Sequence, residues 1–134
     1  MVESYLHLFL KKRAIDCLSQ AGYATYLEPA WSPIPYVQWQ NYRPDVLGVK
    51  TAQDVSEYAF VECETRPRLE RISKKKTSTI SYQSKLTGTS NIRLILVIPA
   101  GTLRNLSMKV RRQWEIWIID RISGTINKID RMNN

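Results

Sequence analysis

The stretch Ile92–Ile98 is the feature of this sequence that most constrains its fold. All but one of its residues are isoleucine, leucine or valine, and Pro99 and Gly101 follow it. An apolar run of this length, ended by residues of that kind, is typical of a central strand buried on both faces. We therefore expect a β-sheet whose two faces are covered by helices.

The rest of the chain predicts an α/β sandwich with a mixed central sheet flanked by helices. Helical spacing, period-two alternation and clusters of turn residues locate its elements. They are a helix over Glu3–Ala21, a strand over Tyr23–Leu27, an irregular loop over Glu28–Arg43, strands over Asp45–Lys50 and Tyr58–Thr65 joined by a hairpin loop at Thr51–Glu57, a helix over Arg68–Leu86, a helix over Leu103–Arg112 and a strand over Trp114–Ile119. The tail Ile122–Ile129 either pairs as a hairpin or remains loose. With no internal repeat and no linker, residues 1–134 are expected to form a single domain.

The balance of charge limits the partners of the protein. Twenty Lys and Arg residues against twelve Asp and Glu leave a formal net charge of +8, with a pI near 9.7. Such an excess favours polyanions, which means nucleic acid or an anionic membrane surface. The alternative is a solvated basic surface that only keeps the protein in solution.

Targeting and cysteine usage indicate a cytoplasmic protein. No apolar run is long enough to span a membrane, and the Leu-rich N-terminal stretch is interrupted by basic residues and lacks a cleavage site. Cys17 and Cys63 are the only cysteines, and neither has a partner at metal-ligand spacing. They are expected to be small core residues in a reducing compartment, and with His7 as the lone histidine no zinc site is expected.

Carboxylates on two neighbouring strands carry the chemistry. Side chains alternate along a strand, so Glu62 and Glu64 share one face, about 6–7 Å apart, while Cys63 points to the other. If Lys50 pairs with Glu57 in the hairpin, Asp45 lies directly across from Glu62. Hard oxygen ligands of this kind bind Mg²⁺ or Mn²⁺, which can polarise a phosphodiester and lower the pKa of bound water. The alternative is that these are solvated carboxylates at a strand edge, paired with nearby arginines.

The motif Pro44-Asp45, followed by Glu62-x-Glu64 at the end of a hairpin strand, resembles the PD-(D/E)xK nuclease superfamily. The order of elements is similar to its archaeal Holliday-junction resolvase and Mrr-like branches. The resemblance implies a restriction-endonuclease-like fold and a metal-dependent DNA endonuclease, with Asp45, Glu62 and the backbone carbonyl of Cys63 as metal ligands. Glu3 would match the family's N-terminal helical acid. A homodimer is implied as well, without a membrane partner or a small-molecule cofactor.

Glu64 departs from the family pattern, which usually has Lys at that position. Some restriction endonucleases of the superfamily carry Glu there, where it would bind the metal or orient the attacking water. In others the lysine comes from a neighbouring helix, and the candidates here are Lys74, Lys75, Lys76 and Lys85. The alternative function is a catalytically inactive nuclease-fold module that binds DNA or another partner.

A basic stretch follows the second acidic strand at once. Its six basic residues are Arg66, Arg68, Arg71, Lys74, Lys75 and Lys76. Phosphates bound there would lie close to the carboxylates, and binding of this kind is strongly salt-dependent. The alternative is a solvated helix face. A second basic cluster, which either extends this surface or solubilises the last helix, comprises Arg104, Lys109, Arg111 and Arg112.

Two further groups of residues are ambiguous. The loop before Asp45 carries four aromatic residues, Trp31, Tyr36, Trp39 and Tyr42. They are predicted to make a dimer contact or to pack in the core, with stacking on unpaired bases as the alternative. His7, one helical turn after Glu3, is predicted to be a surface or packed histidine, with contact to the acidic site as the alternative.

Overall fold

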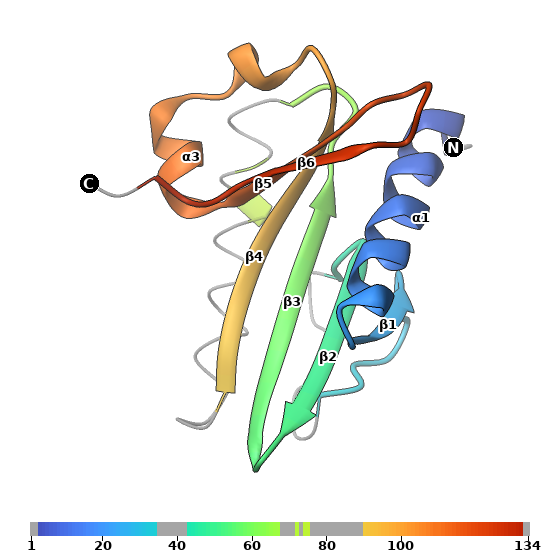
Figure 1. The fold of residues 1–134 in the computed structure, drawn as a ribbon, viewed down its shortest axis with the longest axis vertical. Helices are drawn as coiled ribbons and strands as arrows, with labels where there is room; N and C mark the ends of the chain where they lie inside the picture. The colour runs from blue at the N-terminus through green and yellow to red at the C-terminus, as the bar shows by residue number, and fades with distance from the viewer. Residues whose placement is uncertain (1–2, 35–42, 68–71, 73, 76–89, 133–134) are drawn as a thin grey trace.

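The computed structural model describes residues 3–34, 43–67, 72, 74–75 and 90–132 (Figure 1). A six-stranded sheet in the order β1-β2-β3-β4-β5-β6 forms its centre. The strands are β1 (Ala24–Leu27), β2 (Val46–Ala52), β3 (Val55–Cys63), β4 (Ser90–Pro99), β5 (Glu115–Ile119) and β6 (Ile126–Ile129). Strand β4 is parallel to both β3 and β5, whereas the other neighbours pair antiparallel. The predicted mixed α/β sheet with flanking helices is therefore confirmed.

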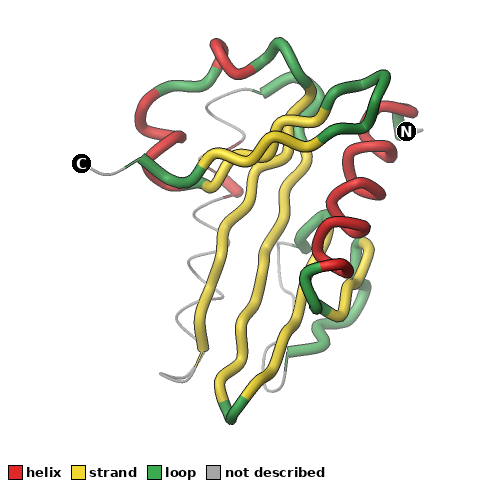
Figure 2. The backbone as a smooth tube through the Cα atoms, in the orientation of Figure 1, coloured by secondary structure: helices red, strands yellow, loops and turns green. Residues whose placement is uncertain are grey.

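Helix α1 (Tyr5–Gln20) covers one face of the sheet, as the side-by-side course of α1 and the strands in Figure 2 shows. It begins at Ser4, whose side chain accepts a hydrogen bond from the His7 amide, and the chain turns away at Gly22, where φ is +95°. Its buried stripe packs against β-branched and small side chains of β2, β3 and β4, and against Trp117. The predicted helix is confirmed within two residues at its start and one at its end.

The opposite face holds the second core. Leu47, Phe60, Leu96 and other apolar residues of the strands pack there against Ile72 and Val110. Val110 belongs to helix α3 (Met108–Gln113), while Ile72 lies in the short described part of the helix predicted over Arg68–Leu86. The remainder of that predicted helix, apart from Lys74 and Lys75, lies outside the described residues. Strand β4 contributes side chains to both cores, which explains the apolar run at 92–98.

The β2–β3 hairpin is tighter than predicted. Its strands pair through Ala52 and Val55, so the loop predicted over Thr51–Glu57 is wrong and only Gln53 and Asp54 remain between them. Both residues have positive φ, 51° and 66°, which is the backbone of the tight turn that matches the twist of a hairpin. Polar residues pair here because strand pairing uses backbone groups and does not require apolar side chains.

Near the C-terminus, the structure corrects one predicted helix and selects one of the two alternatives for the tail. The helix predicted over Leu103–Arg112 is two pieces, a 3₁₀ helix η1 (Leu103–Asn105) and α3, because Ser107 is extended and its side chain caps α3 through the Val110 amide. The tail forms the β5–β6 hairpin. Asp120 accepts amide hydrogen bonds from Ile122 and Ser123 in its turn. Among the described residues, no helix is long and apolar enough to cross a membrane.

Candidate active site around Lys75

The hairpin register brings Asp45 to the end of β3. Lys50 pairs with Glu57 and Val46 pairs with Val61, so Asp45 is the next position beyond the ladder. Its carboxylate oxygen Oδ2 accepts a hydrogen bond of 2.8 Å from the backbone N–H of Cys63. The predicted register is therefore confirmed, and Asp45 is fixed beside Glu62 by the backbone of the neighbouring strand.

Glu62 and Glu64 lie on the face of β3 that points away from α1. Phe60 and Cys63 occupy opposite cores, which confirms the predicted alternation along this strand. The residues Glu62 and Glu64 are 1% and 3% exposed, so they are not solvated carboxylates at a strand edge. Burial of two like charges requires a compensating cation.

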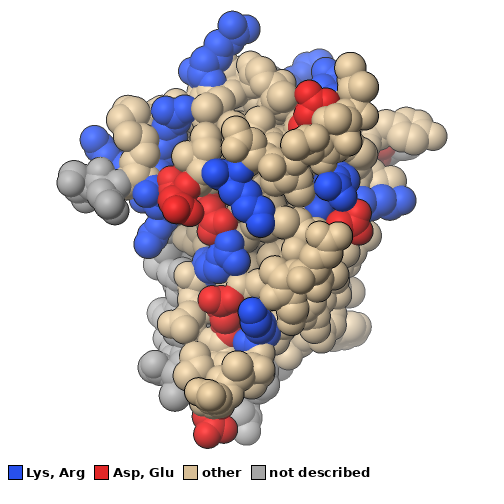
Figure 3. Space-filling view, viewed as in Figure 1, with Lys and Arg blue, Asp and Glu red and all other residues tan. Residues whose placement is uncertain are grey.

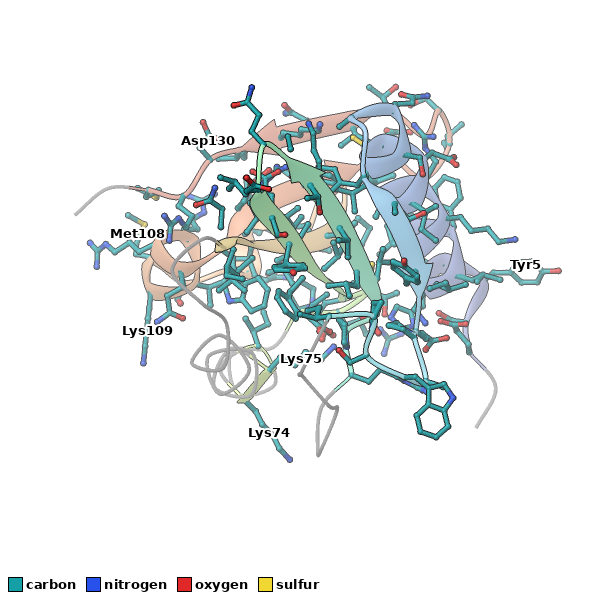
Figure 4. The ribbon with its side chains drawn as sticks, turned by 90° about the horizontal axis from the view of Figure 1, so that it is seen from below. Tyr5, Lys74, Lys75, Met108, Lys109 and Asp130 are labelled. Carbon is teal, nitrogen blue, oxygen red and sulfur yellow. The ribbon has the colours of Figure 1, made fainter. Side chains whose placement is uncertain are left out.

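Lys75 supplies that cation. Its Nζ lies 2.8 Å from Oε2 of Glu62, 2.8 Å from Oε1 of Glu64 and 3.7 Å from Oδ2 of Asp45. In Figure 4 the side chain of Lys75 points toward the sheet, whereas that of Lys74 points away from it. Of the lysines considered from the sequence, Lys75 is the one that the structure places among the acids; Lys76 and Lys85 lie outside the described residues.

The electrostatics of the cluster follow from this contact. Burial raises the pKa of Asp45, but the hydrogen bond with His7, the charge of Lys75 and the Cys63 amide outweigh it and hold the pKa at about 2. Burial lowers the pKa of Lys75, and the surrounding carboxylates, Glu62 first, outweigh that effect and raise it. Asp45 is therefore ionised and Lys75 is protonated across the physiological range.

His7 joins α1 to the same cluster, so the prediction of a surface or packed histidine is wrong. Its Nε2 lies 3.0 Å from the carbonyl oxygen of Cys63 and 3.6 Å from Oδ2 of Asp45, and its Nδ1 lies 2.9 Å from Oε1 of Glu3. Both ring nitrogens face acceptors, which favours the imidazolium form, in which both nitrogens are donors. The hydrogen bond with Asp45 is the main cause that raises the pKa of His7. The i, i+4 spacing of Glu3 and His7 was the signal in the sequence.

Glu3 reaches the cluster only through other residues. It lies just before α1, and its carboxylate pairs with His7 and with Lys11, which is 1% exposed. Lys11 also pairs with Glu28, at 2.9 Å. Burial lowers the pKa of Lys11, but the hydrogen bonds to Glu3 and Glu28 outweigh it and the pKa is raised. Lys11 and Glu28 were not predicted to join this network, because no spacing pattern in the sequence links the helix to the loop after β1.

The other predicted residues lie apart from the acids. Arg66 is exposed just beyond β3, and Lys109 points away from the sheet on α3 in Figure 4. Arg68 and Arg71 lie outside the described residues, as do Tyr36, Trp39 and Tyr42. Trp31 is 87% exposed, so the prediction of core packing is wrong for this residue. Cys63 is buried as predicted, and burial raises the pKa of its thiol.

The donor set suits a hard divalent cation in charge and in atom type. Three carboxyl groups face the ammonium of Lys75, and the Cys63 carbonyl has a second lone pair beyond the one facing His7. Within the part of the chain that the structure describes, however, no three His, Cys, Asp or Glu side chains converge as a ready metal group. The acids converge on the ammonium of Lys75 instead.

Two solved structures share this fold. An XisH family protein from Nostoc punctiforme PCC 73102 has a TM-score of 0.54 at 12% sequence identity, and the similarity covers 91% of this chain and 99% of that one. A fdxN element excision controlling factor protein from Anabaena variabilis has the same TM-score and identity, with 91% and 98% covered. No protein-family model matches the chain, and no curated protein matches it. At this identity the similarity concerns the fold alone.

Proposed function

We propose that this chain is a metal-dependent DNA endonuclease with a restriction-endonuclease-like, PD-(D/E)xK active site. The observation that carries the proposal is the contact of Lys75 with both Glu62 and Glu64, 2.8 Å each, beside Asp45. The motif has Glu64 where such nucleases usually have Lys. Lys75, which follows the acidic strand in the sequence, contacts these acids, and this supports a lysine in the role that the motif lysine usually has.

Each residue of the cluster has a part in that chemistry. Asp45, Glu62 and the Cys63 carbonyl would hold Mg²⁺ or Mn²⁺, which when bound acts as a Lewis acid and lowers the pKa of a bound water. Lys75 has three N–H donors, two of which face Glu62 and Glu64. The positive charge of the ammonium can stabilise the negative charge on a phosphate oxygen. Glu64 holds the ammonium in that position.

His7 and Glu3 support the cluster from α1. The His7 ring donates to the Cys63 carbonyl and approaches Asp45, which are two of the groups assigned to the metal. Outer partners of this kind orient metal ligands, and their loss typically costs about 10- to 100-fold in affinity or activity. Glu3 fixes the ring from the other side, so the role that we propose for Glu3 is positioning and not metal binding.

DNA is the substrate that the charge of the chain supports. A net charge of +8 favours a polyanion, and one of the two similar structures is named as a factor that controls fdxN element excision. Figure 3 shows Lys and Arg side chains spread over the upper part of the face in view, with Asp and Glu among them. Cutting duplex or branched DNA symmetrically needs two active sites, so we propose a homodimer as the working form.

One observation favours a second function, DNA binding without cleavage. Lys75 already compensates the negative charge of the two buried glutamates, so their burial does not require a metal ion. A module that binds DNA without cutting it could therefore keep these acids for their structural role alone. The two functions differ in a single measurable property, metal-dependent hydrolysis.

The test is cleavage of labelled linear duplex, single-stranded, flap and four-way-junction DNA with Mg²⁺ or Mn²⁺. Wild type is compared with Asp45→Asn, Glu62→Gln and Lys75→Met, and Lys74→Met serves as the matched control because its side chain points away from the acids. We expect cutting by wild type and by Lys74→Met, and a loss of about 100-fold or more in the other three. Circular dichroism confirms that each variant is folded. Salt-sensitive binding by a wild type that cuts nothing would establish the binding module instead.

A further inference from the structure

A cleft of about 510 Å³ lies at the carboxyl ends of the parallel strands β3, β4 and β5. Four segments line it: the start of α1, the two residues after Glu64, the turn after β4 and the turn after β5. Its volume is within the range of pockets that hold small ligands, about 300–1,000 Å³. In α/β sheets, the carboxyl ends of parallel strands are where ligands bind.

The cleft and the acidic cluster are built from the same two segments. The amide of Glu64 donates to the carbonyl of Val97 at 2.9 Å, so extended pairing continues one residue beyond β3. Successive side chains of an extended segment point to opposite faces, which directs Glu64 to Lys75 and Thr65 to the cleft. At the start of α1, Glu3 contacts His7 while Ser4 lines the cleft. A ligand in the cleft therefore contacts the same two segments as the acids, on their opposite side.

Two arginines make the cleft electropositive. Arg66 and Arg121 line it from different turns and both are exposed. Among the described residues neither has a carboxylate within ion-pair distance, whereas Arg13 and Arg93 are paired with Asp16 and Glu115. A guanidinium that is not occupied by a carboxylate offers a planar fork of donors, which matches a phosphate group.

The remaining lining suits the same ligand. Ser4 and Thr65 contribute hydroxyl groups, and the first amides of α1 at this end have no acceptor within the helix. These groups add hydrogen-bond donors to the charge of the two arginines. Leu6, Pro99 and Ala100 form an apolar part of the lining, against which a sugar or base can pack. The lining thus combines charge and donors for a phosphate with an apolar surface for the rest of a nucleotide.

We propose that this cleft binds a backbone phosphate of the DNA through Arg66 and Arg121. The identity of the ligand rests on the proposed function, since a basic cleft on the reverse side of the segments that carry a nuclease centre can bind a further phosphate of the same DNA. Arg121 is the new element, because it comes from the β5–β6 turn, far in the sequence from the acidic motif and its basic stretch.

The experiment measures binding without cleavage. Fluorescence anisotropy of a labelled DNA duplex, in EDTA and over a range of salt, is compared for wild type, Arg66→Gln, Arg121→Gln and the double variant. Lys12→Gln is the charge-matched control, because Lys12 is exposed on α1 and does not line the cleft. Each arginine variant should bind about tenfold more weakly, and the slope of log K against log salt should fall by about one per arginine. Arg66→Lys should keep the slope of wild type but lose part of the affinity, because it keeps the charge without the fork.

The outcomes separate this proposal from the proposed function. Arginine variants that bind like Lys12→Gln, with an unchanged salt slope, would overturn the cleft, and so would a wild type that does not bind DNA. A wild type that binds through both arginines but never cuts with Mg²⁺ or Mn²⁺ would refute the nuclease and leave the cleft standing. Metal-dependent cutting by a protein whose binding ignores both arginines would do the reverse.

Discussion

The ammonium nitrogen of Lys75 lies 2.8 Å from Oε2 of Glu62, a residue that is 1% exposed at the end of a central strand. Glu62 belongs to β3, and Lys75 belongs to the helical segment that follows it. Their side chains meet on the face of the sheet that points away from α1. Their contact turns a pair of buried acids from an electrostatic cost into a defined centre of opposite charges. It also decides which lysine of the basic stretch belongs to the site.

Removal of the Lys75 amine is expected to destabilise the fold. Lys75→Met keeps the aliphatic stem but takes the ammonium away from Glu62 and Glu64, and the loss of one partner of a buried ion pair costs about 3 kcal/mol. Urea unfolding at neutral pH without metal measures this. Lys74→Met should stay within about 0.5 kcal/mol of wild type. Equal stability of the two variants would mean that Lys75 does not compensate the acids.

Asp45 should make stability depend on acid pH. Its pKa is about 2 in the folded protein against an ordinary value of 3.8, so the unfolded chain binds more protons between these two values. The resulting stabilisation, about 2 kcal/mol, is fully present above about pH 4 and is lost as the pH falls through 2. Free energies of unfolding from pH 6 to pH 2, in EDTA, should show this slope in wild type. Asp45→Asn should lack that part of it, and an identical slope in the variant would contradict the assignment.

His7 should titrate above its ordinary pKa of 6.5, mainly because of its hydrogen bond with Asp45. It is the one histidine of the chain, so its ring proton signals in an NMR titration need no assignment. Asp45→Asn should lower this pKa toward 6.5. Because the folded value is raised, His7 stabilises the fold below about pH 6.5, and this contribution fades as the pH rises through the folded pKa. A wild-type pKa at or below 6.5 would show that the contact with Asp45 is absent in solution.

Lys11 should matter more through its stem than through its charge. Its side chain is 1% exposed, but its partners Glu3 and Glu28 are 32% and 41% exposed and can be hydrated when the amine is lost. We expect Lys11→Met to cost about 1 kcal/mol, the scale of one net hydrogen bond. Lys11→Ala should cost about 2–3 kcal/mol, because it also leaves a cavity. Thermal or urea unfolding measures both, with the exposed Lys12→Ala as the control; equal losses in the two Lys11 variants would contradict the expected role of the stem.

Features set by interactions between residues close together in the chain could be predicted from the sequence more fully than features set by contacts between distant elements. The strands around Asp45 and Glu62, their register and the opposite faces of Cys63 and Glu64 could be predicted from the sequence. Each follows from alternation along one strand and from a turn that joins neighbours in the chain. The break between η1 and α3 was missed, because a local cap at Ser107 competes with helical spacing of apolar residues over the whole segment.

The amino-acid sequence by itself determined the mixed sheet with flanking helices, the buried central strand and the row of carboxylates at the hairpin end, since these depend on periodicity over a few residues. Only the tertiary structure decided that Lys75 and not another lysine meets those carboxylates, that His7 bridges α1 to Cys63, and that Arg66 and Arg121 face one cleft. The physical reason is that contacts between elements depend on how a helix face or a turn packs on the sheet. That packing is set by the shape of the whole core, which no local pattern in the sequence contains.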